Sequence, residues 1–203
     1  MTASLPPRPE FGTSLPLDPA PEALRFLARR RSASAMTLGL PGPSAEELDI
    51  LLRLATRAPD HGKLAPWRFI VAEGEAKADL AQRLDALAEG RGDRKDQAKL
   101  GKLKAPPLAV VVVSAPRPGD IPLWEQELSA GAVCTTLLYA ALAMGFGANW
   151  ITDWYAFDPQ AAEIIGLGAG ERVAGVILIG TAREAPQERE RPEVGPLVTR
   201  WPG

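Results

Sequence analysis

Cysteine and histidine are almost missing from this sequence. Its 203 residues include one cysteine, Cys134, and one histidine, His61. A lone cysteine forms no internal disulfide, and one residue of each type cannot supply the several ligands that a zinc site needs. The two could still form a nucleophile pair, but Cys134 lies in an apolar segment where cysteine is usually a small buried hydrophobic residue. Carboxylates, hydroxyls or an organic cofactor must then carry the chemistry.

Three further features are lacking, and each excludes a class of protein. The longest aliphatic run, Leu108–Val113, has the length of a strand and is far shorter than a membrane-spanning helix requires. Lys and Arg number 23 against 25 Asp and Glu, so no excess of positive charge attracts nucleic acid. The first residues do not have the charged start and apolar middle of a secretory signal. We therefore expect no membrane and no nucleic-acid partner, and a cytoplasmic location.

Length and composition are those of an ordinary globular domain. Hydrophobic residues make up 46% and charged residues 24% of the chain. Residues 1–21 are rich in proline and show no apolar periodicity, which predicts a mobile or extended arm. No internal repeat or linker divides the remainder, so residues 22–203 are expected to form one domain that includes a C-terminal arm rich in proline and charge.

Apolar spacing and capping residues predict a series of helices. Asp18 is expected to cap the first, over residues 20–31, and the Ser44–Glu47 pair has capping-box spacing ahead of the second, which ends near residue 58. The charged segment 90–104 predicts a surface helix or a mobile segment over the site. The other expected helices cover residues 80–87, 125–144 and 159–165.

Four strands are expected between these helices, at residues 67–71, 108–113, 148–152 and 173–179. The run 108–113 is β-branched and does not alternate with polar residues, which is typical of a central strand covered on both faces. Alternating helices and strands indicate an α/β or α+β fold.

Two glycine-rich segments do not fit a nucleotide-binding motif. Residues 145–147 and 166–170 each lead from a predicted helix to a predicted strand, the reverse of the strand, glycine loop and helix order that binds a pyrophosphate. The sequence also lacks the GxxxxGK[ST] pattern of a P-loop. These glycines are interpreted as helix stops.

Several short motifs occur in a characteristic order along the chain. They are Arg30-Arg31-Ser32, the Arg57-Ala58-Pro59-Asp60-His61 motif, the segment Trp124–Gly131, and Gly145-Phe146-Gly147 before Trp150. In this order they resemble the nitroreductase family, and in particular its compact bacterial NAD(P)H nitroreductases. The best matching blocks are residues 28–34, 55–71, 122–150 and 172–181.

The resemblance implies an α+β fold with a mostly antiparallel central sheet flanked by helices. It also implies an intertwined homodimer that binds FMN at the dimer interface. NADH or NADPH would reduce the flavin, which would then reduce a small-molecule electron acceptor. The flavin itself carries the chemistry in this family, so no catalytic side chain and no metal ligand is expected.

The resemblance also implies which residues bind the cofactor. Arg30, Arg31 and Ser32 are expected at the phosphate and ribityl end, because a guanidinium fork pairs bidentately with phosphate oxygens and a hydroxyl adds a hydrogen bond. Arg57 and His61 match flavin-contacting positions of the compact subfamily. The segment Trp150, Ile151 and Thr152 matches a second flavin-contacting stretch.

The chain departs from the family pattern where many members carry another arginine. It has Ser34, Ala35 and Met36 there, and the C-terminal arginines 183, 189, 191 and 200 offer alternative phosphate partners among which the sequence does not choose. Besides the oxidoreductase, two alternatives therefore stay open. One is a protein that binds or stores FMN without turnover, and the other is a homologue without flavin that serves as an interaction protein.

Overall fold

A computed structural model describes residues 7–201, and its core is a sheet in which every pair of strands is antiparallel. The order in the described part is β1, β5, β3, β2, and β4 also pairs with β5. The strands are β1 (Leu38–Gly39), β2 (Trp67–Glu73), β3 (Leu108–Ser114), β4 (Gly147–Ile151) and β5 (Arg172–Ala182). The expected α+β fold is confirmed.

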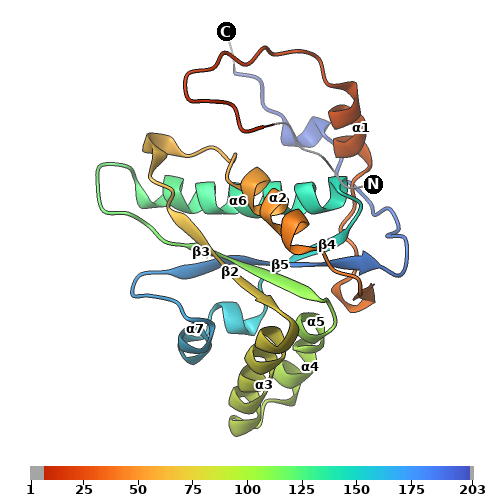
Figure 1. The fold of residues 1–203 in the computed structure, drawn as a ribbon, viewed down its shortest axis with the longest axis vertical. Coiled ribbons are helices and arrows are strands. Elements are labelled where there is room, and N and C mark those ends of the chain that lie inside the picture. The colour runs from red at the N-terminus through yellow and green to blue at the C-terminus, as the bar shows by residue number, and fades with distance from the viewer. Residues whose placement is uncertain (1–6, 202–203) are drawn as a thin grey trace.

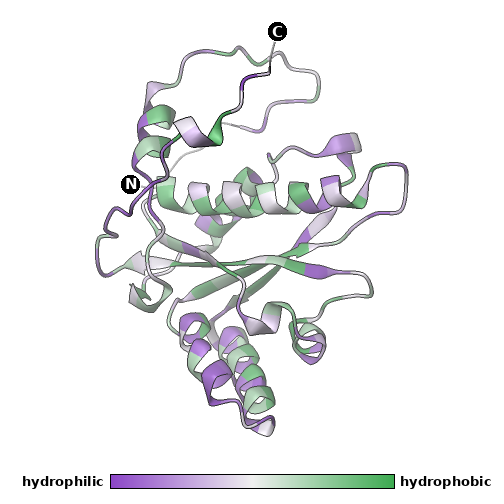
Figure 2. Cartoon of the chain, turned by 180° about the vertical axis from the view of Figure 1, so that it is seen from behind, coloured by the Kyte–Doolittle hydropathy of each residue, from purple (hydrophilic) through white to green (hydrophobic). Residues whose placement is uncertain are grey.

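Helices form a layer on each side of this sheet, as Figure 1 shows, with α2 and α6 on one side and α3, α4, α5 and α7 on the other. Their bounds are α1 Pro21–Arg29, α2 Ala45–Ala55, α3 Gly74–Gly90, α4 Arg94–Lys99, α5 Gly101–Lys104, α6 Leu123–Ala143 and α7 Pro159–Ile165. Short 3-10 turns lie at Ala35–Thr37, His61–Lys63, Trp154–Ala156 and Gly195–Leu197. Figure 2 shows hydrophobic colour concentrated on the strands between the two layers.

The strand β3 is buried on both faces, as its sequence predicts. Its side chains alternate between two cores: Val111 belongs to the cluster on the α3 side, and Val110 and Val112 belong to the cluster beneath α2 and α6. Because successive side chains of a strand point to opposite faces, a strand between two helical layers needs apolar residues at every position. This explains the uninterrupted run, and β3 indeed pairs with β5 on one edge and β2 on the other.

Local signals placed several helix ends correctly, although α3 begins at Gly74 and not near residue 80 as expected. Ser44 and Glu47 form the capping box of α2, and Asp158 accepts hydrogen bonds from two amides of α7. Gly166 ends α7 in the left-handed conformation, with a φ of 89°, as a helix stop should. The helix α2 ends at Ala55, three residues before the expected position.

The predicted cap of the first helix is wrong. Ala20, with φ −119° and ψ 76°, occupies the N-cap position of α1 in place of Asp18, and no side chain caps this helix. The residue before a proline is disfavoured in helical conformation, so Pro21 sets the first helical position. The apolar side of α1 is also uncovered in the chain, since Leu24 and Leu27 are 69% and 51% exposed.

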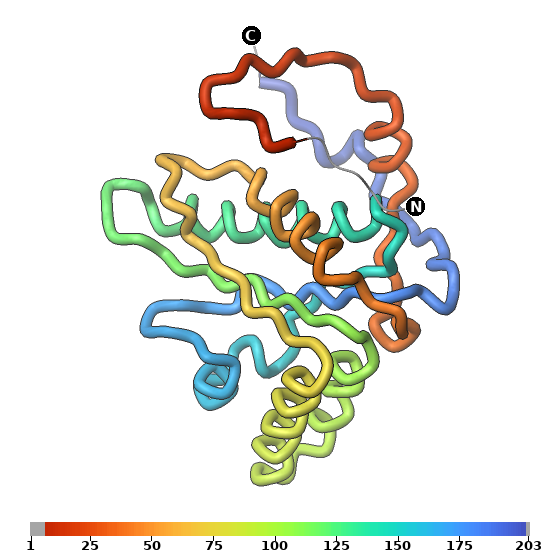
Figure 3. Tube along the Cα trace, viewed as in Figure 1, coloured from red at the N-terminus to blue at the C-terminus, as the bar shows by residue number. Residues whose placement is uncertain are grey.

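The charged segment 90–104 is helical and largely exposed up to Lys99, which agrees with one of its two expected forms, but its position differs from expectation. It forms α4 and α5, and Leu100 and Leu103 are fully buried in the core on the α3 side. It therefore packs on the face of the sheet opposite α6 and does not cover the site residues beside that helix. The backbone trace in Figure 3 shows that the chain before α1 and the chain after β5 both lie outside these layers.

Candidate functional site

The first group of candidate residues follows the C-terminus of α1. Arg30 is the C-cap residue, and its amide donates to the Phe26 carbonyl at 2.8 Å. Its guanidinium lies 5.2 Å from the centroid of the Tyr139 ring on α6, and Nη2 lies 3.5 Å from Ser32 Oγ. Its Nε is buried and has no hydrogen-bond partner within residues 7–201. A buried donor without an acceptor is costly, which makes Arg30 a candidate for binding an acceptor from outside the described chain.

The neighbouring Arg31 is held by the C-terminal segment. Its Nε donates to the Gln187 carbonyl at 2.8 Å and lies 3.8 Å from a carboxylate oxygen of Glu188. Arg31, Ser32 and the chain after β5 line a cavity of about 390 Å³. The Glu188 carboxylate would repel an anion that enters this cavity unless the anion displaces it, whereas the planar fork of Arg31 would attract the anion.

A pair of hydrogen bonds fixes this segment to β4. The Ala33 amide donates to the Ala148 carbonyl at 3.0 Å, and the Asn149 side chain donates to the Ala33 carbonyl. The sequence analysis did not single out Asn149, although an amide side chain in an apolar strand is a recognisable signal. Trp150 and Ile151 follow on the same strand, and Thr152 comes directly after its end.

These three residues face different surroundings. Trp150 is 37% exposed and its indole lies on the backbone of Gly175, where an added Cβ would come within 2.1 Å of Nε1. Ile151 packs against the core on the α3 side, and Thr152 is exposed. Of these three residues, Trp150 and Thr152 are therefore the two that are exposed.

The second group lies in the loop after α2. Asp60 organises the loop, because its carboxylate accepts from the amides of Leu64 at 3.2 Å and Ala65 at 2.8 Å. His61 takes no part in these hydrogen bonds. Its Nδ1 lies 2.8 Å from a carboxylate oxygen of Glu125 in the first turn of α6. Since a carboxylate only accepts, Nδ1 carries the proton and Nε2 remains for a ligand.

Ser129 ties the same loop to α6. The Ser129 hydroxyl is buried, donates to the Pro59 carbonyl at 2.7 Å and accepts from the Trp67 indole at 3.1 Å. Pro59, His61, Trp124, Glu125, Leu128, Ser129 and Ala132 line a groove of about 430 Å³. Neither Glu125 nor Ser129 was assigned a role from sequence, because both act through contacts with a loop more than 60 positions away.

Arg57 lies on the other side of this loop. Together with Arg8, Arg53 and the prolines of the N-terminal arm, it lines a cavity of about 400 Å³. Phe11 of the arm lies over the Lys63 ammonium, with 5.5 Å between Nζ and the ring centroid. The arm residues 7–11 therefore run beside the loop that carries Arg57 and His61.

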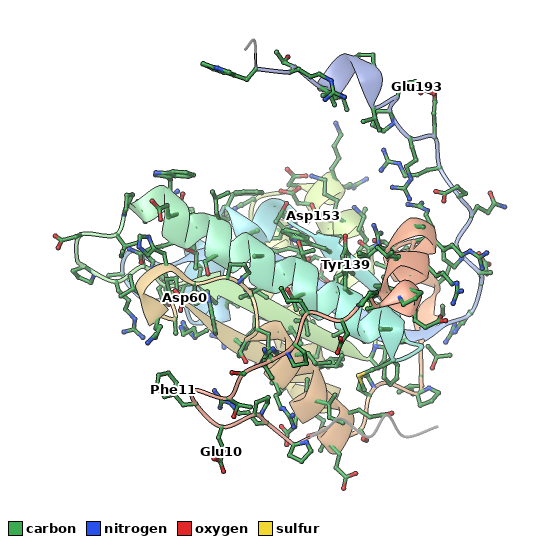
Figure 4. All side chains as sticks on the ribbon, turned by 90° about the horizontal axis from the view of Figure 1, so that it is seen from above. Glu10, Phe11, Asp60, Tyr139, Asp153 and Glu193 are labelled. Carbon is green, nitrogen blue, oxygen red and sulfur yellow. The ribbon has the colours of Figure 1, made fainter. Side chains whose placement is uncertain are left out.

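The two groups are not brought together within one chain. Figure 4 shows Asp60 beside the first half of α6 and Tyr139, the neighbour of Arg30, beside its second half. Glu125 and Tyr139 are 14 positions apart on this helix, which corresponds to about 21 Å at 1.5 Å per residue. The loop group and the arginine group thus form two half-sites at opposite ends of α6.

Other chemistry finds little support in the described part of the chain. Residues 7–201 contain no group of three or more His, Cys, Asp or Glu side chains that could hold a metal ion. Cys134 is fully buried, and burial raises the pKa of its thiol to about 12, as expected for an unreactive cysteine. Within the same residues, no helix is both long enough and apolar enough to cross a membrane.

Comparisons with known proteins agree with this fold and these motifs. The model of the Nitroreductase family matches residues 27–181. The chain is 35% identical to the "Putative NAD(P)H nitroreductase YdjA" of Escherichia coli K12 over 88% of this chain and 98% of that protein. It is 36% identical to a "Putative NAD(P)H nitroreductase" of Haemophilus influenzae over 83% of this chain and 92% of that protein.

Solved structures show the same fold at lower identity. A nitroreductase-like family protein of Bacillus cereus superposes with a TM-score of 0.79 at 23% identity, covering 94% of this chain and all of that one. A nitroreductase of Bacteroides fragilis with bound FMN gives a TM-score of 0.66 at 20% identity, covering 88% of this chain and 98% of that one.

Proposed function

The chain belongs to the nitroreductase family, and from that premise we propose that it is an FMN-dependent NAD(P)H oxidoreductase. Its acceptor would be a nitroaromatic, a quinone or a similar small molecule, reduced in a ping-pong sequence. The names of its relatives and the FMN held by a structural neighbour support this proposal. The observation in this chain that carries it is the buried Arg30 Nε beside Ser32 and Arg31, for which the described residues supply no acceptor.

Arg30, Arg31 and Ser32 would hold the FMN phosphate and ribityl chain. The two guanidinium groups provide the donors and the positive charge that a phosphate needs, and the Ser32 hydroxyl adds one more donor. Trp150 and Ile151 end β4, which is bonded to the same segment through Ala33, and Thr152 follows directly after the strand. Trp150 and Thr152 are the members of that stretch that are exposed to a ligand.

Arg57 and His61 would contact the flavin of a second subunit. Because they lie at the other end of α6 from Arg30, a homodimer that places one end of α6 beside the other end of its partner would unite the half-sites. The apolar side chains that such an interface would cover are present: Leu27 of α1 and Trp124 and Leu128 of α6 are all more than half exposed.

FMN, when bound, supplies the hydride chemistry, accepting from a reduced nicotinamide and delivering to the acceptor. The residues of the chain position the reactants and hold a proton. Glu125 accepts from His61 Nδ1 and fixes the imidazole, which leaves Nε2 to face a bound molecule. Trp124 and Leu128 supply apolar walls for a flat substrate.

Replacing both Arg30 and Arg31 by alanine tests the phosphate assignment. We expect the variant to fold but to lose FMN, measured by fluorescence titration of the purified protein, because both phosphate forks are removed. Arg29→Ala is the matched control, since Arg29 is the exposed last residue of the same helix. Equal FMN occupancy in the double variant and the control would remove this assignment.

Mixed dimers test whether the site is shared between subunits. The Arg30→Ala/Arg31→Ala chain is co-expressed with a chain carrying Arg57→Ala and His61→Ala, each with a different affinity tag, and the heterodimer is purified over both. One of its two sites is then intact, so it should bind about one FMN per dimer, whereas each homodimer binds little. If the heterodimer binds no more FMN than the homodimers, the half-sites do not combine across subunits.

A further inference from the structure

A second cavity lies on the face of the sheet away from α6. It has a volume of about 620 Å³ and is bounded by α3, by the segment between α5 and β3, and by the ends of β1 and β5. We call it the α3–β1 cavity, and its walls include Gly39, Lys77, Ala81, Lys104, Pro107 and Arg183. It is lined by Arg183, one of the C-terminal arginines that the sequence left open as phosphate partners, but by none of Arg30, Arg31, Ser32, Arg57, His61 and residues 150–152. Its size is within the range of pockets that bind small molecules.

Positive side chains outnumber negative ones in this cavity. Lys77 is 7% exposed, and its ammonium donates to the carbonyls of Leu103 at 2.9 Å and Lys104 at 3.0 Å. The Lys104 ammonium lies 2.7 Å from a carboxylate oxygen of Asp85. The cavity thus contains three cationic groups, counting Arg183, and one carboxylate. A bound molecule with negative charge would balance them.

Unlike Lys77 and Lys104, Arg183 has a positive group that is available to bind a ligand. Its amide donates to the Thr37 carbonyl at 3.0 Å, which fixes its backbone beside β1. Its guanidinium lies directly on the backbone of Gly39, where a Cβ would meet Nε at 2.5 Å and Nη2 at 2.6 Å. Within residues 7–201 this guanidinium forms no hydrogen bond or ion pair. Only glycine at position 39 leaves room for this placement.

The rest of the wall is apolar and rigid. Ala78 and Ala81 present one side of α3 to the cavity, and Pro106 and Pro107 form the opposite side. Proline and alanine lose little side-chain entropy when a ligand covers them. An apolar body could pack between these walls while its charged end reaches Arg183 or Lys104.

We propose that the α3–β1 cavity binds a small organic anion in which a carboxylate is attached to a compact apolar body. The guanidinium of Arg183 provides a planar fork that matches the two oxygens of a carboxylate, and Lys104 provides a second positive group. The alanine and proline walls take the apolar part. The site is separate from the flavin site and does not depend on the proposed enzymatic function.

Benzoate is a suitable probe, because it joins a carboxylate to a flat apolar ring. It is titrated into the purified full-length protein and followed by isothermal calorimetry and by the NMR signals of the arginine Nε–H groups. Benzyl alcohol, which lacks the charge, and inorganic phosphate, which lacks the ring, are titrated in parallel. We expect benzoate to bind more tightly than either and to shift the Arg183 signal. Equal binding of benzyl alcohol or phosphate, or no binding of benzoate, would overturn the proposal.

Two variants test the role of Arg183. Arg183→Gln removes the fork, and Gly39→Ala displaces the guanidinium without changing the charge, since the clashing atoms are the far end of a flexible side chain. Each should weaken benzoate binding about fivefold, because a partly exposed charge pair contributes roughly 1 kcal/mol, which corresponds to that factor in the dissociation constant. Arg83→Gln is the control, because Arg83 is on α3 but does not line the cavity. Unchanged affinity in both variants, or an equal loss in the control, would refute the assignment.

Discussion

Removal of the Ser129 hydroxyl should destabilise the protein more than the loss of a single hydroxyl group usually does. The hydroxyl joins the loop that carries His61 to α6, since it donates to the Pro59 carbonyl at 2.7 Å and accepts from the Trp67 indole at 3.1 Å. Ser129→Ala leaves both groups without their partner. An unsatisfied buried polar group costs about 1 to 3 kcal/mol. Both hydrogen bonds are partly buried, although Pro59 itself is exposed, so we expect a loss of about 2 kcal/mol in the free energy of unfolding.

Urea denaturation measures this loss as a lower midpoint with an unchanged slope. Thr136→Ala is the control: its hydroxyl on the same helix donates to the Ala132 carbonyl one turn earlier, and its removal should change stability by less than about 0.5 kcal/mol. In a Trp67→Phe background, which already lacks the indole donor, the cost of Ser129→Ala should fall to about 1 kcal/mol. A cost below about 0.5 kcal/mol in the wild type, or equal costs in both backgrounds, would refute the bridging role.

Two other predictions concern ion pairs outside the site. Arg68 donates to both carboxylate oxygens of Glu171 and lowers the pKa of that carboxyl from 4.5 to about 2. A lowered folded-state pKa contributes stability above pH 4.5 that is lost as the pH falls toward 2. Glu171→Gln should therefore reduce the change in the free energy of unfolding between pH 4.5 and 2 by about 1 kcal/mol. The effect is limited because Arg68 is partly exposed. The free energy of unfolding is measured between about pH 5 and 2 for the wild type and for Glu171→Gln. The same pH dependence in both proteins would show that the ion pair contributes nothing. Asp158→Ala removes the cap of α7 and the partner of Arg91, and should lower the free energy of unfolding by about 1 to 2 kcal/mol. Asp158→Asn keeps the cap and should lower it less. Equal urea midpoints for the two variants would contradict the capping role.

Features set by neighbouring residues were predictable from sequence. The capping box at Ser44 and the cap at Asp158 depend on residues within one helical turn, and the apolar run of β3 directly reflects its two covered faces. The one wrong cap, at Asp18, failed because Pro21 overrides it: a proline keeps the residue before it out of the helix.

Features that depend on distant contacts were not predictable. The segment 90–104 reads as a charged surface, and only the fold shows that Leu100 and Leu103 are buried beside α3. In the same way, the sequence places His61 on a loop but does not reveal Glu125 as its partner, 64 positions away. Family resemblance supplied the candidate cofactor residues. The structure adds that His61 contacts Glu125 in the first turn of α6, whereas Arg30 contacts Tyr139 in its second half.

The most direct test of the proposed function is an absorbance spectrum of the freshly purified protein, repeated without oxygen after addition of NADH or NADPH. The chromophore released by heat is identified by its mass. We predict flavin bands that bleach on reduction and a released molecule with the mass of FMN. Flavin bands that do not bleach with either nucleotide would indicate a protein that binds FMN without turnover. A colourless protein that gains no flavin bands when FMN is supplied would contradict the assignment as a flavoenzyme.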